Sequence, residues 1–191
     1  MKKPYIIGIA GGSASGKSTL CDKLEQELNQ YSLKIFHMDS YFKPEKERPF
    51  VAAPVTKKMY VDDNHPETMY LEQLFLDLKK AVNESYDIII IEGLLALWDE
   101  EIYPYLNLKL FVDCRADERI VRRLHRNMEW GLSFDDISQV YLDMVRYRHD
   151  EYVEPTKWRA DLIINGSSPQ DKAVDMILTY IIKEINVGYN N

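Results

Sequence analysis

A glycine-rich segment near the N-terminus carries the strongest chemical signal in the sequence. It fits the Walker A pattern of glycine, four residues, Gly-Lys and Ser or Thr. The residues of this segment are Gly11, Gly12, Ser13, Ala14, Ser15, Gly16, Lys17, Ser18 and Thr19. Backbone N–H groups in such a turn, with the positive end of the helix that follows, bind nucleotide phosphates. We therefore expect this segment to bind ATP, with Lys17 reaching the β and γ phosphates and Ser18 binding Mg²⁺.

Two acidic residues stand where apolar runs end. Asp39 follows the run 33–38, and Glu92 follows the run 88–91. Ligands of an open α/β sheet bind outside the carboxyl ends of its strands. We predict that Asp39 accepts the proton of an acceptor hydroxyl and that Glu92 binds magnesium or positions water. Helix capping is the alternative for each, and Asp113, which also ends a run, is equally explained by pairing with an arginine.

Four arginines of the segment after Asp113 fall at i, i+3, i+4 and i+7, and these are Arg119, Arg122, Arg123 and Arg126. This spacing places them on one face of a helix, where like charges repel unless an anion is near. A lid over residues 115–133, with a hinge at Gly131, would bring them to a transferring phosphoryl group. The alternative is a solvated face balanced by Asp117, Glu118 and Glu129.

The elements that must position these residues alternate between strand and helix patterns. Short β-branched runs predict strands over 5–10, 33–38, 87–91, 108–112 and 162–164. Apolar residues spaced by three or four predict helices over 17–30, 69–83, 116–128, 134–152 and 170–184. Alternating strands and helices are typical of an α/β domain. We expect a doubly wound sandwich with a five-stranded, mainly parallel sheet.

One long segment breaks this alternation. Residues 40–66 hold four prolines among charged residues and are expected to form a loop at one edge of the sheet. Long loops in compact domains are usually functional or disordered. We therefore interpret 40–66 as the loop that binds the acceptor.

Composition bounds the class of protein. A chain of 191 residues with 46% hydrophobic residues is the size of one domain, which we place at 1–191. Its formal charge of −7 argues against nucleic acid as a partner. The apolar runs are too short for a membrane helix or a secretion signal. Cys21 and Cys114 lie in no metal or redox spacing, which favours two reduced thiols in the cytoplasm over a disulfide. A homo-oligomer is left open.

Taken together, these motifs resemble the uridine kinase and phosphoribulokinase family of P-loop kinases, and within it the uridine kinases most. The resemblance rests on residues 9–19, 38–42, 65–67, 91–97, 111–113, the arginine helix, 154–157 and 160–164. It implies a three-layer P-loop NTPase fold with a helical lid, and transfer of the γ-phosphoryl group of ATP to a hydroxyl. The acceptor would be the 5′-hydroxyl of a nucleoside such as uridine or cytidine. By resemblance Asp39 is the base, and Arg123 and Arg126 are lid contacts.

The acceptor side of this resemblance carries three departures. We assign Tyr41, Phe42 and His65 to the acceptor pocket. The family's ribose-binding aspartate aligns with Asn64, which leaves Asp62 or Asp63 as a substitute. The hairpin that precedes the Glu92 strand in uridine kinases is missing, because residues 79–86 run directly into that strand. The lid's usual Arg-Gly-Arg reads Trp130-Gly131-Leu132 here.

The sequence leaves two other functions open and disfavours a third. A nicotinamide-riboside-type kinase also lacks the long hairpin and would use the same base at Asp39. An ATP-binding protein without acceptor chemistry would explain the departures. A nucleotide-dependent switch is disfavoured because neither an Asn/Thr-Lys-x-Asp nor an Asp-x-x-Gly string occurs in the sequence.

Overall fold

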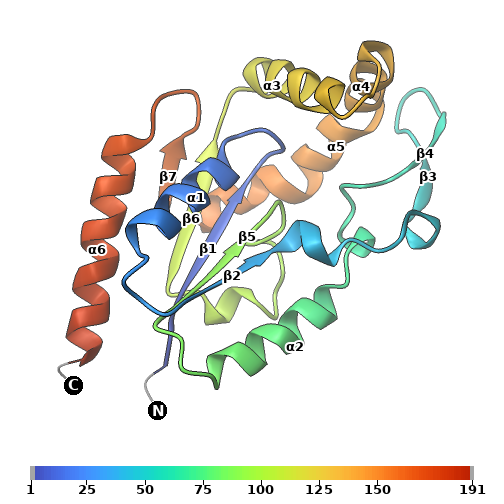
Figure 1. Cartoon of the computed structure of the whole chain (residues 1–191). Helices are drawn as coiled ribbons and strands as arrows, with labels where there is room; N and C mark the ends of the chain where they lie inside the picture. Colours follow the sequence, from blue (N-terminus) through green and yellow to red (C-terminus); the bar gives the residue numbers. More distant parts are fainter. Residues whose placement is uncertain (1–2, 190–191) are drawn as a thin grey trace.

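The chain folds around one parallel sheet covered on both faces by helices (Figure 1). The computed structural model describes residues 3–189. The strand order is β2-β5-β1-β6-β7, and all four neighbouring pairs are parallel. The strands are β1 (Tyr5–Gly11), β2 (Leu33–His37), β5 (Ile88–Glu92), β6 (Leu108–Asp113) and β7 (Leu162–Asn165). The predicted five-stranded sheet is confirmed, with strand ends within one residue of the expected positions.

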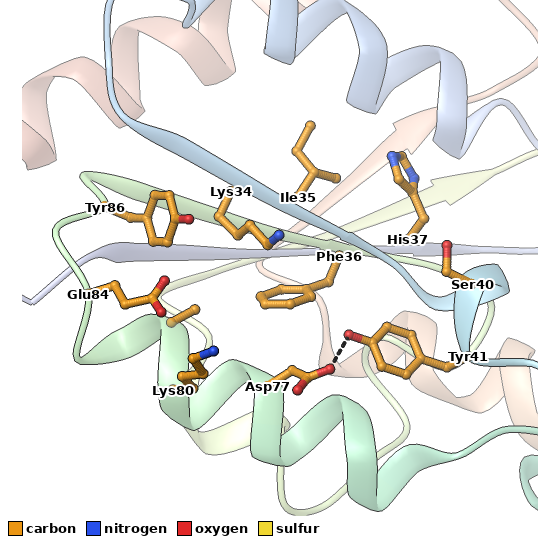
Figure 2. A pocket seen from close by; sticks show the side chains of 11 residues that line it. Lys34, Ile35, Phe36, His37, Ser40, Tyr41, Asp77, Lys80, Glu84 and Tyr86 are labelled. Carbon is orange, nitrogen blue, oxygen red and sulfur yellow. Dashed lines mark hydrogen bonds between the residues drawn. The ribbon is translucent and has the colours of Figure 1, made fainter.

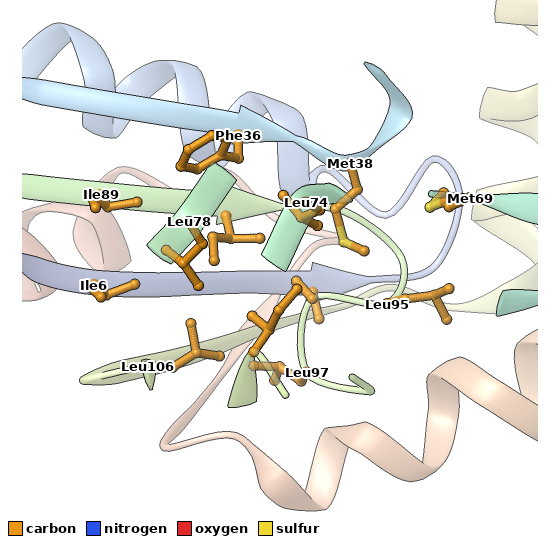
Figure 3. Packing of buried hydrophobic residues seen from close by; sticks show 14 of the residues in the cluster. Ile6, Phe36, Met38, Met69, Leu74, Leu78, Ile89, Leu95, Leu97 and Leu106 are labelled. Atoms are coloured by element: carbon orange, nitrogen blue, oxygen red, sulfur yellow. The ribbon is translucent and has the colours of Figure 1, made fainter. Parts of the chain in front are cut away.

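Helices pack on the two faces of this sheet because its central strands are apolar on both sides. On one face lie α1 (Lys17–Glu27) and α6 (Asp171–Tyr189), which bury Leu20, Leu24 and Ile177 against Ile7 and Ile9 of β1. On the other lies α2 (Leu71–Val82) (Figure 3). Neighbouring residues of a strand point to opposite faces. A near-continuous apolar run such as that of β5, buried along its whole length, is typical of a parallel sheet.

A third group of helices lies over the carboxyl end of the sheet (Figure 1). These are α3 (Ala116–Glu129), α4 (Phe134–Val140) and α5 (Arg146–Arg148). The helix expected over 134–152 is one helical run that continues to Val153, with π-helical stretches at Tyr141–Val145 and His149–Val153. π-helical turns often occur at functional sites, and these two lie on either side of α5.

The segment 40–66 is not the irregular loop that the prolines suggested. It contains an antiparallel hairpin formed by β3 (Phe50–Ala52) and β4 (Met59–Val61). Strands of three residues are too short to show an alternating pattern, and the prolines stand outside them. The Tyr60 hydroxyl donates to Asp143 Oδ2 at 2.7 Å, which ties the hairpin to the helical run after α4.

The connection from α2 to β5 is short, as expected. Helix α2 ends at Val82 and β5 begins at Ile88, so five residues join them and no hairpin intervenes in this part of the described chain. Strand β2 lies at the edge of the sheet. A cleft of about 510 Å³ lies between β2 and α2, lined by Lys34, Phe36, Asp77 and Lys80 among others (Figure 2).

Neither a membrane-spanning helix nor a disulfide bond is present among the described residues. Among the described residues, no helix combines the length and the apolar character needed to span a membrane. Cys21 and Cys114 are both buried and form no disulfide. The expected pair of free thiols is therefore what the structure has.

Candidate active site

The Walker A residues form a turn between β1 and α1. Ala14 and Gly16 adopt left-handed backbone angles, with φ of 62° and 100°, and the Ser15 N–H donates to the Gly12 carbonyl at 3.0 Å. The Ser15 hydroxyl is fully buried and has no protein partner. A cleft of about 480 Å³ opens beside the turn, lined by Ala14, Gly16, Lys17, Ser18, Thr19, Arg122 and Arg126. A buried hydroxyl without a partner, next to the N-terminus of a helix, favours binding of an anion at this turn.

Glu92 lies beside the start of α1, as its place at the end of β5 predicts. The Ser18 hydroxyl donates to Glu92 Oε1 at 3.0 Å, and Lys17 Nζ lies 3.6 Å from the same oxygen. His37 Nδ1 lies 3.1 Å from the other oxygen, Oε2. Carboxylate and hydroxyl oxygens are ligands that magnesium accepts. Sequence reasoning placed Ser18 and Glu92 together, and the structure brings them together.

Asp39 lies in the turn after β2 and faces a second cavity of about 400 Å³. Lys17, Ser13, Arg123 and Arg126 line the same cavity. The Asp39 carboxylate is exposed and accepts no hydrogen bond from the described residues. A carboxylate in this state can accept a proton from a hydroxyl that enters the cavity.

A close contact just beyond the ends of β2 and β5 fixes the position of Asp39. The preceding residue, Met38, is fully buried, and it packs against Gly93, which follows Glu92. A Cβ atom added at Gly93 would lie 2.5 Å from Met38 Cβ, so only glycine fits there. Asp39 and Glu92 are therefore held at the same edge of the sheet by the Met38 side chain against Gly93.

Two arginines of α3 converge on the phosphate-binding turn. Arg123 Nη1 and Arg126 Nη2 donate to the Ser13 hydroxyl at 2.9 and 3.2 Å. Within the described residues neither guanidinium forms an ion pair, and Arg123 Nε is buried without a partner. Burial lowers the pKa of both groups, and the charge of Arg126 lowers that of Arg123 further. The carboxylates of Asp63 and Asp39 offset part of this lowering, at Arg123 and Arg126 respectively. An anion at this turn would stabilise the two neighbouring cations further.

The other two arginines of the predicted face have structural partners. Arg119 is buried and donates through Nε to the Cys114 carbonyl at 3.0 Å. Arg122 donates to the Gly166 carbonyl and pairs with Glu118. Of the four arginines, only Arg122 therefore fits the alternative of a solvated helix face balanced by nearby acidic residues. Asp113 pairs with Lys157 at 2.6 Å, where the sequence had suggested an arginine.

The cavity beside Asp39 has a second wall that is mostly apolar. Its side chains are Phe42, Leu94, Trp130, Leu132, Ile137 and Val140, with Asp63, Asn64, Asn127 and Asp136 between them. Sequence reasoning missed the residues of α4. Ile137 and Val140 stand three apart on that helix, so its apolar periodicity was the signal that could have identified them. The cavity is cationic toward Ser13 and apolar or acidic elsewhere.

The residues predicted for the acceptor divide into two groups. Phe42, Asp63 and Asn64 line the cavity. Tyr41 does not, because its hydroxyl donates to Asp77 Oδ2 at 2.9 Å in the cleft beside β2 (Figure 2). His65 caps the short helical turn at 66–68, where its Nδ1 accepts the Glu67 N–H at 3.1 Å. The structure thus brings neither Tyr41 nor His65 to Asp39.

A buried histidine packs behind the phosphate-binding turn. His149 Nε2 lies 3.3 Å from Glu154 Oε2, while a Cβ atom on Gly12 would lie 3.0 Å from His149 Cε1. Burial, followed by the charge of Arg119, lowers the pKa of His149 to about 4. Glu154 is also within 3.5 Å of Lys157, which reduces its ability to stabilise an imidazolium. The imidazole is therefore neutral at pH 7.

This histidine should make stability depend on pH. The unfolded chain binds a proton at His149 near pH 6.5, and the folded chain only near pH 4. The stability that the folded chain gains from neutral His149 is therefore complete above pH 6.5 and is lost as the pH falls toward 4. We expect the free energy of unfolding of the wild type to fall by about 2–3 kcal/mol more than that of His149→Phe between pH 7.5 and 4.5. Urea unfolding at both pH values measures this difference, and equal losses would contradict it.

Known proteins resemble this chain over most of its length. The profile of the phosphoribulokinase / uridine kinase family matches residues 50–173. The uridine kinase of Lactobacillus helveticus (strain DPC 4571) is 32% identical over 211 aligned positions, covering 97% of this chain and 98% of that protein. The uridine kinase of Clostridium botulinum (strain Okra / Type B1) is 35% identical, covering 95% and 97%. An alignment of 211 positions exceeds the 191 residues of this chain, so the first relative carries residues that this chain lacks.

Solved structures share the fold. A putative fructose transport system kinase from Silicibacter sp. TM1040 superposes with a TM-score of 0.65 at 17% identity, covering 85% of this chain and 90% of that one. A possible uridine kinase from Bacillus stearothermophilus gives a TM-score of 0.58 at 20% identity, covering 85% and 89%. Identities this low establish the three-layer architecture alone.

Proposed function

Because this chain belongs to the phosphoribulokinase and uridine kinase family, we propose that it phosphorylates the 5′-hydroxyl of a nucleoside with ATP. It is a phosphotransferase that acts on a hydroxyl group of a nucleoside-like small metabolite. The observation that carries the proposal is the position of Asp39, whose carboxylate shares a cavity with Lys17 and the two arginines on Ser13. An ATP-binding protein without acceptor chemistry would not require that carboxylate.

The nucleotide phosphates would be held by residues Gly11 to Thr19. The buried Ser15 hydroxyl without a partner and the two adjacent arginines, which form no ion pair within the described residues, both support an anion at this turn. In phosphoryl transfer the protein mainly positions the reactants and neutralises charge. Lys17, Arg123 and Arg126 would do this at the transferring group.

Kinases of this family use magnesium with ATP, and the residues present fit that ion. Ser18 and Glu92 would hold it, since their oxygen atoms lie within 3.0 Å of each other. Magnesium usually takes one or two carboxylates and receives its other ligands from phosphates and water. When bound, it neutralises negative charge on the phosphates.

At the acceptor end, Asp39 would act as general base. The acceptor oxygen forms a bond to the γ-phosphorus, the bond from that phosphorus to the ADP oxygen breaks, and the hydroxyl proton passes to the Asp39 carboxylate. Phe42 and Asn64 line the same cavity as Asp39 and would contact the acceptor.

The cavity wall favours an acceptor that carries no phosphate of its own. Its only cations among the described residues are Lys17, Arg123 and Arg126, and both arginines are bound to Ser13. The remaining wall is apolar, with the carboxylates of Asp63 and Asp136. Asp63 is paired with Arg48 at 2.8 Å, so the Asp136 carboxylate would be the one to repel a second phosphate, whereas a ring with hydroxyl groups fits the wall. A nucleoside is therefore favoured over a sugar phosphate.

We also infer the organisation of the chain around this site. Residues 1–191 would form one kinase domain, with 40–66 on the acceptor side and 115–133 as a lid. Gly131 has a φ of 89° and ends α3, with the Leu132 N–H donating to the Asn127 carbonyl at 3.2 Å. A hinge at Gly131 would have to open this capping turn. The two buried free thiols support a cytoplasmic location.

A panel of acceptors tests the proposed function. ADP release from Mg-ATP would be measured with uridine, cytidine, adenosine, nicotinamide riboside, pantothenate and ribulose 5-phosphate. We expect turnover with a nucleoside and none with ribulose 5-phosphate, because no cation among the described residues lines the far wall of the cavity. Faster turnover with ribulose 5-phosphate would contradict the proposed acceptor class. If no acceptor of the panel gave ADP release although ATP binding was shown separately, the result would favour an ATP-binding protein without acceptor chemistry.

A further inference from the structure

The turn that supplies Asp63 and Asn64 to the cavity is built on a buried carboxylate. The Asp62 side chain is fully buried. Its Oδ1 accepts the Asn64 N–H at 3.1 Å, and its Oδ2 accepts Arg148 Nε at 2.5 Å. Asp62 therefore joins the backbone of the turn to helix α5, and it does not face the cavity as a substitute ligand.

Arg148 is fixed by further contacts on the same side. Its Nη1 donates to Glu151 Oε2, and its guanidinium lies 5.7 Å from the centre of the Tyr152 ring. Tyr152 meets the His65 ring edge-to-face at 5.2 Å. Both ends of the turn 62–65 thus rest on the helical run 146–152, one through an ion pair and the other through an aromatic contact.

The buried ion pair of Asp62 and Arg148 depends on a cation at position 148. A buried carboxylate requires a partner, because desolvation disfavours an isolated charge. The Arg148 side chain is largely buried too, and its pKa is raised by the hydrogen bonds to Asp62 and Glu151 in spite of its burial. From α5, the Arg148 side chain reaches Asp62 through Nε. Arg148 itself does not line the cavity.

We propose that Arg148 is a positioning residue for the acceptor. It acts through Asp62 to hold the turn 62–65 so that Asp63 and Asn64 face the cavity. The role rests on the proposed function, since it assumes that the acceptor binds beside Asn64. It assigns to α5 and its flanking π-helical turns a part in acceptor binding.

Steady-state kinetics with the best nucleoside of the panel test this role. We expect Arg148→Gln to raise the KM for the nucleoside by about 10- to 100-fold, as small displacements of binding groups do, with the KM for ATP changed less than about 2-fold. Arg148→Lys, which keeps the charge, should recover part of the loss. Arg159→Gln is the matched control, because Arg159 also pairs with a carboxylate, that of Glu100, outside the cavity. Equal changes in both KM values, or none, would overturn the proposal.

A second variant covers the case in which Arg148→Gln does not fold. Asp62→Leu combined with Arg148→Met removes both charges and keeps apolar volume, an exchange that buried ion pairs often tolerate. It also removes the acceptor of the Asn64 N–H. A folded double variant should therefore still show a raised nucleoside KM, and a wild-type KM would overturn the proposal.

Hydrogen exchange separates failure of this role from failure of the proposed function. The Asn64 amide is bonded to Asp62, so we expect peptides covering 59–65 to exchange faster in Arg148→Gln than in wild type or Arg159→Gln. This readout needs no substrate. If the wild type phosphorylates no nucleoside but the turn loosens as expected, the proposed function fails and the coupling stands. If exchange is unchanged, the coupling itself is wrong.

Discussion

Asp39→Asn should lower kcat by about 10²- to 10⁴-fold and leave ATP binding nearly unchanged. The amide keeps the size of the side chain but cannot accept the proton of the acceptor hydroxyl. Because the Asp39 carboxylate accepts no hydrogen bond from the described residues, the substitution breaks no hydrogen bond of the fold. Measurement of kcat with the best acceptor, beside nucleotide titration of the same variant, gives both quantities.

The control for this variant is a neighbouring acid outside the cavity. Glu45 is exposed and follows Asp39 in the same segment, so Glu45→Gln should retain wild-type turnover. A thermal unfolding midpoint within about 2 °C of wild type for Asp39→Asn would show that the fold is intact. Near wild-type kcat in Asp39→Asn would show that the base has been assigned to the wrong residue.

Arg123→Gln and Arg126→Gln should each lower kcat by about 10²- to 10³-fold. Both guanidinium groups donate to Ser13 at the phosphate-binding turn, where charge develops as the phosphoryl group moves. The free protein should not lose stability in proportion, because each substitution removes one of two partly buried, adjacent cations and so relieves their repulsion. Pyrophosphate should raise the unfolding temperature of wild type more than that of either variant.

Arg115→Gln is the matched control for these variants. Arg115 is largely exposed and stands just before α3, with Asp117 near it. It should keep both the turnover and the pyrophosphate stabilisation of wild type. If the two α3 variants behaved like Arg115→Gln, the arginines would be surface charges and residues 115–133 would have no part in catalysis.

The nucleotide side of the site was predictable because it is local or follows from strand order. Gly11 to Thr19 are contiguous, so their spacing alone predicts the turn. Asp39 and Glu92 are far apart in sequence, but each ends a strand of a parallel sheet, and such ends share one edge. The helical period placed Arg123 and Arg126 together. It did not show that Arg119 turns instead to the Cys114 carbonyl.

The acceptor side was less predictable because it depends on tertiary contacts. Asp62, Asp63 and Asn64 are consecutive and all polar, and the sequence could not tell which of them would be buried against Arg148, 86 residues away. Tyr41 follows two residues after Asp39, yet its hydroxyl reaches Asp77 on α2. The hairpin of β3 and β4 has strands too short for a period to appear.

The strand order has a consequence for how the protein is made. Strand β1, which ends in the phosphate-binding turn, is synthesised first, yet its two neighbours are β5 and β6. Its pairing must therefore wait for residues that lie about a hundred positions later, and such distant contacts form slowly. Asp39 has its place only once β2 has joined β5. On the ribosome, a nascent chain that ends before Asp113 should have no nucleotide site. ATP can therefore stabilise the protein only after β6 has been synthesised.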